Sequence, residues 1–232
     1  MKNIINLTAA LLLAAGLAAS GFFVKCGLDN FHKPIGLVHV KGLVEIPVKS
    51  DYVVWQFYYE DDGADLQQAI EKSHLSKAAI ERFLVKYDLT SAAKPTLPVV
   101  KRIEQENKPT RIVIKSGVTI SSPNVDKVDE AYSASSTLLN EGVNFVDAWN
   151  SRPRYKYTKF NERRPEFFAK AVQNARTMAE KFAQDSGVTL GKIENADQGS
   201  FEMLGLHTGH EDEPYSKEKL MRVVSRFSYT VK

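Results

Sequence analysis

Two histidines in an acidic stretch near the C-terminus could hold a metal ion. His207 and His210 are followed by the acidic run 211–213, and imidazole with carboxylate is a donor set that zinc and other transition metals accept. No cysteine or third histidine lies nearby, and a loop holds two histidines at this spacing only loosely. We therefore expect a solvated acidic loop at 207–213, with no metal and no cofactor.

A pair of carboxylates could do acid–base chemistry in the first third of the chain. Glu45 and Asp51 are six positions apart, and two carboxyl groups can share the work of a general acid and base. Asp51 follows Ser50 at a bend between strands, however, where an aspartate more often fixes the turn. No Ser-His-Asp, Cys-His or metal-ligand set can be assembled, so we expect no catalytic residues and no enzyme.

Basic and aromatic residues alternate in Arg152–Lys159, as they do in grooves that bind single-stranded nucleic acid. Strand alternation would put Tyr155, Tyr157 and Lys159 on one face. The N-terminal segment described below indicates export from the cytoplasm, which argues against a nucleic-acid partner. We expect an exposed strand face or a subunit contact instead.

The segment Gly187–Lys192 has some features of a phosphate-binding loop. Only three residues separate Gly187 from Gly191, where that motif needs four, and Ile193 stands where it needs serine or threonine. The segment also follows a helix and not a strand. The structural interpretation, a helix stop followed by a turn, explains it better.

The first two dozen residues predict a segment that targets the protein to a membrane. Lys2 precedes Ile4–Val24, a run of 21 residues without a charge, and such a helix is about 30 Å long, enough to cross the hydrocarbon core. Alternatively, the small-x-small pattern Ala18–Ser20 could direct cleavage before Gly21. The run continues past Ser20, so we expect a retained anchor with the rest of the chain outside the cytoplasm.

The composition limits which classes of protein this chain can belong to. The 232 residues are 43% hydrophobic, and 31 basic residues nearly balance 28 acidic ones. A substantial core can therefore form, and the net charge of +3 gives no reason to expect nucleic acid. The single cysteine, Cys26, cannot form an internal disulfide. Lys25 in front of it disfavours a lipoprotein, whose processing needs a small residue there.

Hydrophobic periodicity predicts the elements that position these residues. Alternation predicts strands, and recurrence every three or four residues predicts helices. In chain order we expect strands at 38–48 and 52–59, a helix at 66–87, strands at 99–103 and 111–121, a helix at 124–139 capped by Asn124, a long strand at 143–160, a helix from Asn161 to 182 with Pro165 in its first turn, and strands at 189–203 and 220–231.

The pattern predicts an α+β fold. Each helix has one apolar face, so we expect a two-layer arrangement with a mostly antiparallel sheet and helices on one face, built from two β-α-β-β-like halves, plus an N-terminal hydrophobic helix. We expect Tyr58 and Tyr59 in the core. The most regular helical stripe is made of seven residues: Phe168, Ala171, Val172, Ala175, Met178, Ala179 and Phe182. The boundaries would be an anchor or signal peptide at 1–24, a tether at 25–36 and one domain at 37–232.

Four blocks of the sequence resemble the SIMPL-domain family of bacterial envelope proteins. The opening strand has the family's pattern at Val40, Gly42, Glu45, Val48, Asp51 and Trp55. The other matching blocks are Asp126–Val128, the alanine-rich helix and turn of Ala169–Gln198 with Gly187, Leu190, Gly191 and Ile193, and the closing strand Lys219–Val224. The acidic loop 206–213 departs from the family pattern.

The resemblance implies location and fold better than chemistry. Relatives are periplasmic or membrane-anchored, some form large ring-like oligomers, some are linked to oxidative-stress tolerance, and no shared catalytic mechanism provides site residues. We therefore expect a protein tethered to the inner membrane by residues 4–24, with its domain in the periplasm, that acts by self-assembly or interaction with a protein partner still to be identified. The alternatives are a cleaved, soluble periplasmic form, a small-ligand or partner-binding module, and a hydrolase using the 207–213 loop.

Overall fold

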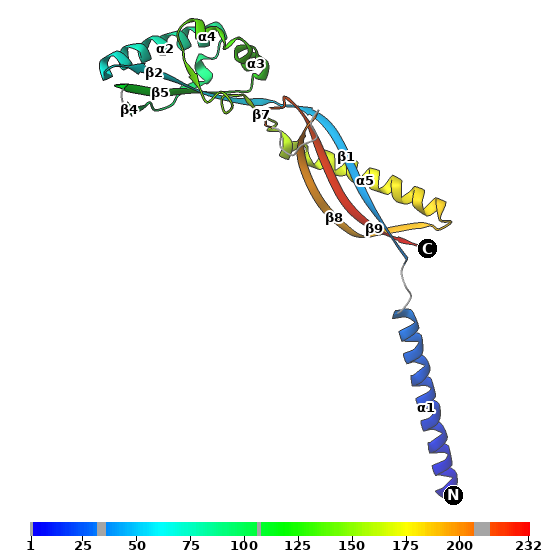
Figure 1. The fold of residues 1–232 in the computed structure, drawn as a ribbon. Helices are drawn as coiled ribbons and strands as arrows, with labels where there is room; N and C mark the ends of the chain where they lie inside the picture. Colours follow the sequence, from blue (N-terminus) through cyan, green and yellow to red (C-terminus); the bar gives the residue numbers. More distant parts are fainter. Residues whose placement is uncertain (1, 32–35, 106–107, 207–213) are drawn as a thin grey trace. The chain divides into compact units, whose positions relative to one another are not determined.

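The computed structural model describes residues 2–31, 36–105, 108–206 and 214–232. The contacts between residues divide the chain into two compact units, each made of separate segments. One unit contains the chain up to Val40 together with Arg176–Ala196 and Phe227–Lys232, and the other contains Lys41–Ala175 and Asp197–Arg226. Figure 1 shows the elements of both.

The larger sheet is built around two long antiparallel strands, β2 (Tyr52–Gly63) and β5 (Lys108–Ser122). Their register places Trp55 opposite Ile120. The sheet order is β3-β5-β2-β6, and β4 also pairs with β5 while β7 pairs with β2. The shorter strands are β3 (Ala93–Pro95), β4 (Val99–Gln105), β6 (Phe145–Val146) and β7 (Arg154–Lys156).

Helices cover one face of this larger sheet (Figure 1). They are α2 (Leu66–Lys86), α3 (Val125–Ala134) and the short α4 (Thr137–Asn140), with a 3-10 turn, η1 (Thr90–Ala92), after α2. Every second residue of β2 from Val53 to Tyr59 is buried beneath them, in one core with Ile80 and Phe83 of α2. The Asn124 side chain accepts a hydrogen bond from the Lys127 amide at 3.3 Å, so the predicted helix cap is confirmed.

The smaller sheet has the order β1-β9-β8, from β1 (Gly36–Lys49), β9 (Glu218–Val231) and β8 (Leu190–Gly205). Helix α5 (Phe160–Asp185) packs against β1 at Gly42. A Cβ atom at this position would collide with the carbonyl oxygen of Ala171. Glycine is therefore required here because the helix backbone approaches the strand so closely.

The predicted α+β class is confirmed, with antiparallel sheets and five α-helices in the described residues. The set β2-α2-β4-β5 builds the larger sheet, and β1, α5, β8 and β9 form the second β-α-β-β set. The opening strand of the second set is thus β1, from the beginning of the chain. The strand expected to open the second set, at 143–160, is not part of the smaller sheet.

The predicted long strand at 143–160 is wrong. The structure has only β6 and β7 there, and both pair with β2. Asp147 adopts a positive φ of 58°, and its carbonyl accepts backbone hydrogen bonds from Asn150 and Ser151. This turn breaks the run into two short pieces, because aspartate readily adopts the left-handed conformation that a continuous strand excludes.

The start of the third predicted helix also differs. Helix α5 begins at Phe160, so Asn161 lies inside it and does not cap it, and Pro165 stands within the helix. The predicted stop is confirmed: Gly187 has φ of 69°, and the Val188 amide bonds to the Ala183 carbonyl at 3.0 Å. Glycine at this left-handed position ends the helix without strain.

The N-terminal helix α1 runs from Lys2 to Phe31 and therefore includes the first part of the expected tether. Its described apolar side chains are exposed, among them Leu13, Phe22 and Phe23. Within the described residues, no helix meets the length and hydropathy needed to cross a membrane.

Candidate interaction surface

Helix α5 contacts its sheet through small side chains. Ala171, Ala175, Ala179 and Ala183 recur every four residues and are almost completely buried. Their size matches the close approach at Gly42, because a helix that packs through alanines can lie very near a sheet. The contact strip is consequently narrow.

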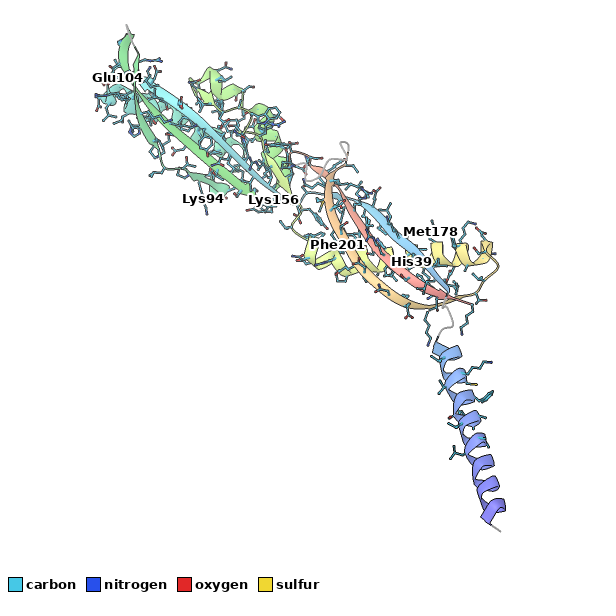
Figure 2. All side chains as sticks on the ribbon, turned by 60° about the horizontal axis from the view of Figure 1, so that its bottom comes forward. His39, Lys94, Glu104, Lys156, Met178 and Phe201 are labelled. Atoms are coloured by element: carbon cyan, nitrogen blue, oxygen red, sulfur yellow. The ribbon has the colours of Figure 1, made fainter. Side chains whose placement is uncertain are left out.

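The larger residues of the predicted stripe lie outside this strip. Met178 is 56% exposed and Phe182 is 58% exposed, and Figure 2 labels Met178 on α5. The prediction that these two residues form part of the buried face is wrong. The alanines and Phe167 make the buried face of α5. Residues 178 and 182 are each offset by one position from a buried alanine, which turns them about 100° around the helix.

Strand β8 is exposed along most of its length. Every residue from Gly191 to Ser200 is exposed, including Ile193 at 47%, whereas β9 beside it alternates between buried and partly exposed residues. A strand covered on one face would alternate. Since β8 is also an outer strand of its sheet, one of its edges carries amide and carbonyl groups not used in that sheet.

A glycine with positive φ lies near the middle of β8. Gly199 has φ of 65°, and a Cβ there would collide with the Val224 carbonyl of β9. The Ser225 hydroxyl donates to the Gln198 carbonyl at 2.8 Å beside it. A left-handed residue departs from the extended conformation of a strand, so the regular pairing edge of β8 is interrupted at Gly199.

The segment Gly187–Lys192 leads from α5 into β8. Thr189 and Lys232 exchange two backbone hydrogen bonds, at 2.8 and 3.0 Å, and the Lys192 amide donates to the Thr230 hydroxyl at 3.0 Å. These groups are used by β9, as expected for a helix stop followed by a strand. The structural interpretation of this segment as a helix stop is therefore the part that the structure supports.

The two candidate carboxylates each have their own structural partner. Glu45 on β1 lies 3.5 Å from the Arg222 guanidinium on β9. Asp51 accepts hydrogen bonds from the Thr158 amide at 2.7 Å and the Thr158 hydroxyl at 3.1 Å. Asp51 thus ties the bend after β1 to the residues before α5, whereas the sequence predicted that it fixes the turn itself.

The basic and aromatic segment is only partly exposed. In β7, Arg154 and Lys156 are exposed while Tyr155 between them is buried in the core of the larger sheet. The exposed face of this strand therefore carries Arg154 and Lys156, and Tyr155 lies on the opposite face, as strand alternation predicts. The predicted core position of Tyr59 is confirmed, whereas Tyr58 is half-buried, with the Lys115 ammonium 4.9 Å from the centre of its ring.

Tyr155 belongs to a charged network that the sequence did not reveal. Its hydroxyl donates to Asp129 at 2.6 Å, and the Lys217 ammonium lies 2.7 Å from Asp126 and 3.2 Å from Asp129. Burial, together with the neighbouring Asp129, raises the pKa of Tyr155. Hydrogen bonds from Lys217 and then Lys49 lower the pKa of Asp126. The network joins α3 to β7 and to the chain before β9.

The candidate metal ligands at 207–213 lie outside the described residues. Within the parts of the chain that the structure does describe, no group of three or more His, Cys, Asp or Glu side chains could hold a metal ion. Cys26 is exposed and unpaired on α1.

Comparison with known proteins adds one result. The sequence profile of the SIMPL family, described as a protein of unknown function (DUF541), matches residues 38–225. This range includes the larger sheet, α5 and β8. No curated protein matches the chain.

Proposed function

The chain belongs to the SIMPL family, as its four motif blocks predict, and we propose that this member is an assembly module that associates with further copies of itself along strand β8. The observation that carries the proposal is the exposure of Gly191–Ser200 on both faces of an outer strand. Outer strands are natural templates for pairing with another chain.

Exposed apolar residues in the same unit as the first part of β8 favour a protein partner. Met178, Phe182 and Ile193, which we call the α5–β8 residues, are about half exposed and lie in one unit of the structure. Covering a large apolar side chain contributes roughly 1.5–3 kcal/mol. A partner that covers these residues would therefore gain apolar burial in addition to backbone hydrogen bonds.

A second copy of the chain is the occupant that the sheet favours. Strand β8 is one outer strand of the three-stranded sheet and β1 is the other, so each copy has two different edges. Pairing the β8 edge of one copy with the β1 edge of the next is a heterologous contact, which produces rings or filaments. Strand β8 carries four charged residues, which restrict pairing to an edge of matching pattern: Lys192, Glu194, Asp197 and Glu202.

The proposal is tested by light scattering on residues 27–232 with two matched substitutions. Ile193→Lys puts a charge on β8, and Val99→Lys puts the same charge on β4, another strand position that is similarly exposed, at 50% against 47%. We expect the wild type and Val99→Lys to assemble at micromolar concentration. We expect Ile193→Lys to be a monomer, because an unpaired ammonium would be buried in the contact.

Two outcomes would contradict the assembly proposal. One is a monomeric wild type at high micromolar concentration. The other is an oligomer that both substitutions leave intact, because β8 would then have no part in it. Circular dichroism on each variant separates loss of assembly from loss of folding.

The proposal also includes a location, the periplasmic side of the inner membrane with residues 4–24 as a retained anchor. Its support is the uncharged run after Lys2 and the exposed apolar side chains of α1. After cell fractionation, we expect the full chain to stay in the membrane pellet through an alkaline wash. A soluble periplasmic product that begins at Gly21 would show cleavage instead.

The physiological role that we attach to the assembly is tolerance of oxidative or envelope stress. Its support is the resemblance to the family. A deletion strain that survives peroxide as well as its parent strain would contradict it.

A further inference from the structure

A second candidate site lies in the larger sheet and shares no residue with the assembly proposal. Helix α2 and the sheet enclose a cavity of about 650 Å³, within the size range of small-molecule sites. Its apolar walls come from both sides: Leu66, Ile70, Ile80 and Leu84 of α2, and Val100 and Ile114 of the sheet. The β3–β4 side of the sheet, which runs between Lys94 and Glu104 in Figure 2, borders it.

The α2 residues that line the cavity run from Leu66 to Leu84, which at the rise of a helix is about 27 Å. An extended peptide would leave backbone amides unpaired against apolar walls.

Three charged or titratable side chains stand along the α2 wall: His74, Lys77 and Glu81. Lys77 is about half exposed, and its ammonium is 3.8 Å from the Glu81 carboxylate, a long contact that leaves it able to pair with another anion. At the floor, the buried Tyr59 hydroxyl is hydrogen-bonded to Ser116, and the pKa of Tyr59 is raised by burial and by the negative charges of Asp61 and Glu81. The floor thus disfavours an anion, whereas the wall at His74 and Lys77 can accept one.

We propose that this cavity binds a single-chain fatty acid, with its carboxylate at Lys77 and His74 and its hydrocarbon chain along α2 from there toward Leu66. One hydrocarbon chain needs no hydrogen-bond partners and suits the apolar walls of the cavity. Its burial is favourable by about 0.8 kcal/mol for each methylene group. The head group stays at the solvent-exposed wall, where its charge remains hydrated.

The test measures displacement of the uncharged fluorescent probe N-phenyl-1-naphthylamine from the full chain by palmitate. Ser73→Trp places a large ring in the cavity, since Ser73 lines it. Leu75→Trp, two residues along α2, places the same ring on the surface, where Leu75 is 70% exposed. We expect palmitate to bind the wild type and Leu75→Trp equally and to bind Ser73→Trp at least about tenfold more weakly, a loss of about 1.4 kcal/mol.

The comparison of the two tryptophan variants also controls for binding at α1, whose exposed apolar side chains both variants share. Equal affinity of palmitate for the two variants, or no displacement from the wild type, would overturn the proposal. Because the cavity does not involve β8, the Ile193→Lys variant should bind palmitate as the wild type does. Failure of assembly and failure of binding are therefore separate results.

A second arm tests the chemical class of the ligand. Lys77→Gln should weaken palmitate about threefold, the effect of a solvent-exposed ion pair, and leave 1-hexadecanol unchanged. Lys72→Gln is the control, because Lys72 does not line the cavity and pairs with Asp62. If hexadecanol binds the wild type as tightly as palmitate does, or if Lys77→Gln weakens both ligands equally, the carboxylate has no role and the proposal is wrong.

Discussion

Asp61 on β2 has a buried carboxylate with an incomplete set of hydrogen bonds. Its Oδ1 accepts from the Ser76 hydroxyl at 2.6 Å, and its Oδ2 is buried without a hydrogen-bond partner among the described residues. Burial raises the pKa of this carboxyl group, while the bond from Ser76 opposes the shift. The ionised form is thus less favourable in the folded protein than in the unfolded chain.

We predict that Asp61→Asn stabilises the protein at neutral pH by about 1 kcal/mol, because an amide can still accept from Ser76 and is not charged. The pKa of Asp61 is higher in the folded protein than in the unfolded chain, so ionising Asp61 destabilises the fold. This destabilisation is largest at pH values above the folded-state pKa. The destabilisation disappears as pH falls below the unfolded pKa. Urea unfolding at neutral and acidic pH should therefore show a stabilisation that shrinks on acidification.

The neighbouring Asp62→Asn is the control, because Asp62 is half exposed and pairs with Arg111 at 3.1 Å. We expect this variant to change the free energy of unfolding by less than about 0.5 kcal/mol. A destabilised Asp61→Asn at every pH would contradict the assignment of Asp61 as a buried, strained charge.

For single residues, the sequence predicts the roles of those whose contacts are with neighbours in the chain. The cap at Asn124 and the stop at Gly187 depend on the adjoining turn of helix, and both are confirmed. The partners of Asp61 and Tyr155 could not be predicted. They come from α2 and α3, which fold onto these strands from elsewhere in the chain.

Helix α5 shows what periodicity can and cannot establish about an element. The recurrence of apolar residues predicts the helix, and the alanines fix the face that contacts the sheet. The same recurrence includes Met178 and Phe182, because periodicity records apolar character and not the identity of the covering surface. Whether a partner chain covers them is a property of the assembly.

The close packing of α5 against β1 makes a direct prediction at Gly42. Gly42→Val should destabilise the protein by about 1–3 kcal/mol, because the added side chain must displace the helix backbone at Ala171. Thermal unfolding followed by circular dichroism measures the effect. Lys41→Ala, on the exposed side of the same strand, is the control and should change the free energy of unfolding by less than about 0.5 kcal/mol. A Gly42→Val variant as stable as this control would contradict the packing.

On the scale of the whole molecule, strands from opposite ends of the chain form one sheet. Strand β1 begins at Gly36 and lies next to β9, which ends at Val231, and the His39 imidazole is 2.8 Å from the Ser228 hydroxyl across the pair. Alternation predicted both strands but could not choose between β1 and the run at 143–160 as the opening strand of the second set. Which strands pair in the sheet is decided by packing after the chain collapses, and a single sequence contains no signal for that choice.

The exposure of β8 has only a weak signal in the sequence. Residues 194–200 are polar or small, without the alternation of a half-buried strand. The pattern of residues 194–200 is equally typical of a loop. The sheet order identifies β8 as an outer strand, because β9 pairs with only one of its edges.

The most direct test of assembly is amide hydrogen exchange on wild-type residues 27–232 at low and high micromolar concentration. In the free chain the outward amides of an edge strand exchange quickly, and pairing with another copy protects them. We predict that peptides from Leu190–Ser200 become protected as the concentration rises, while peptides from β4, Val99–Gln105, do not change. Exchange in Leu190–Ser200 that is the same at both concentrations would contradict assembly along β8.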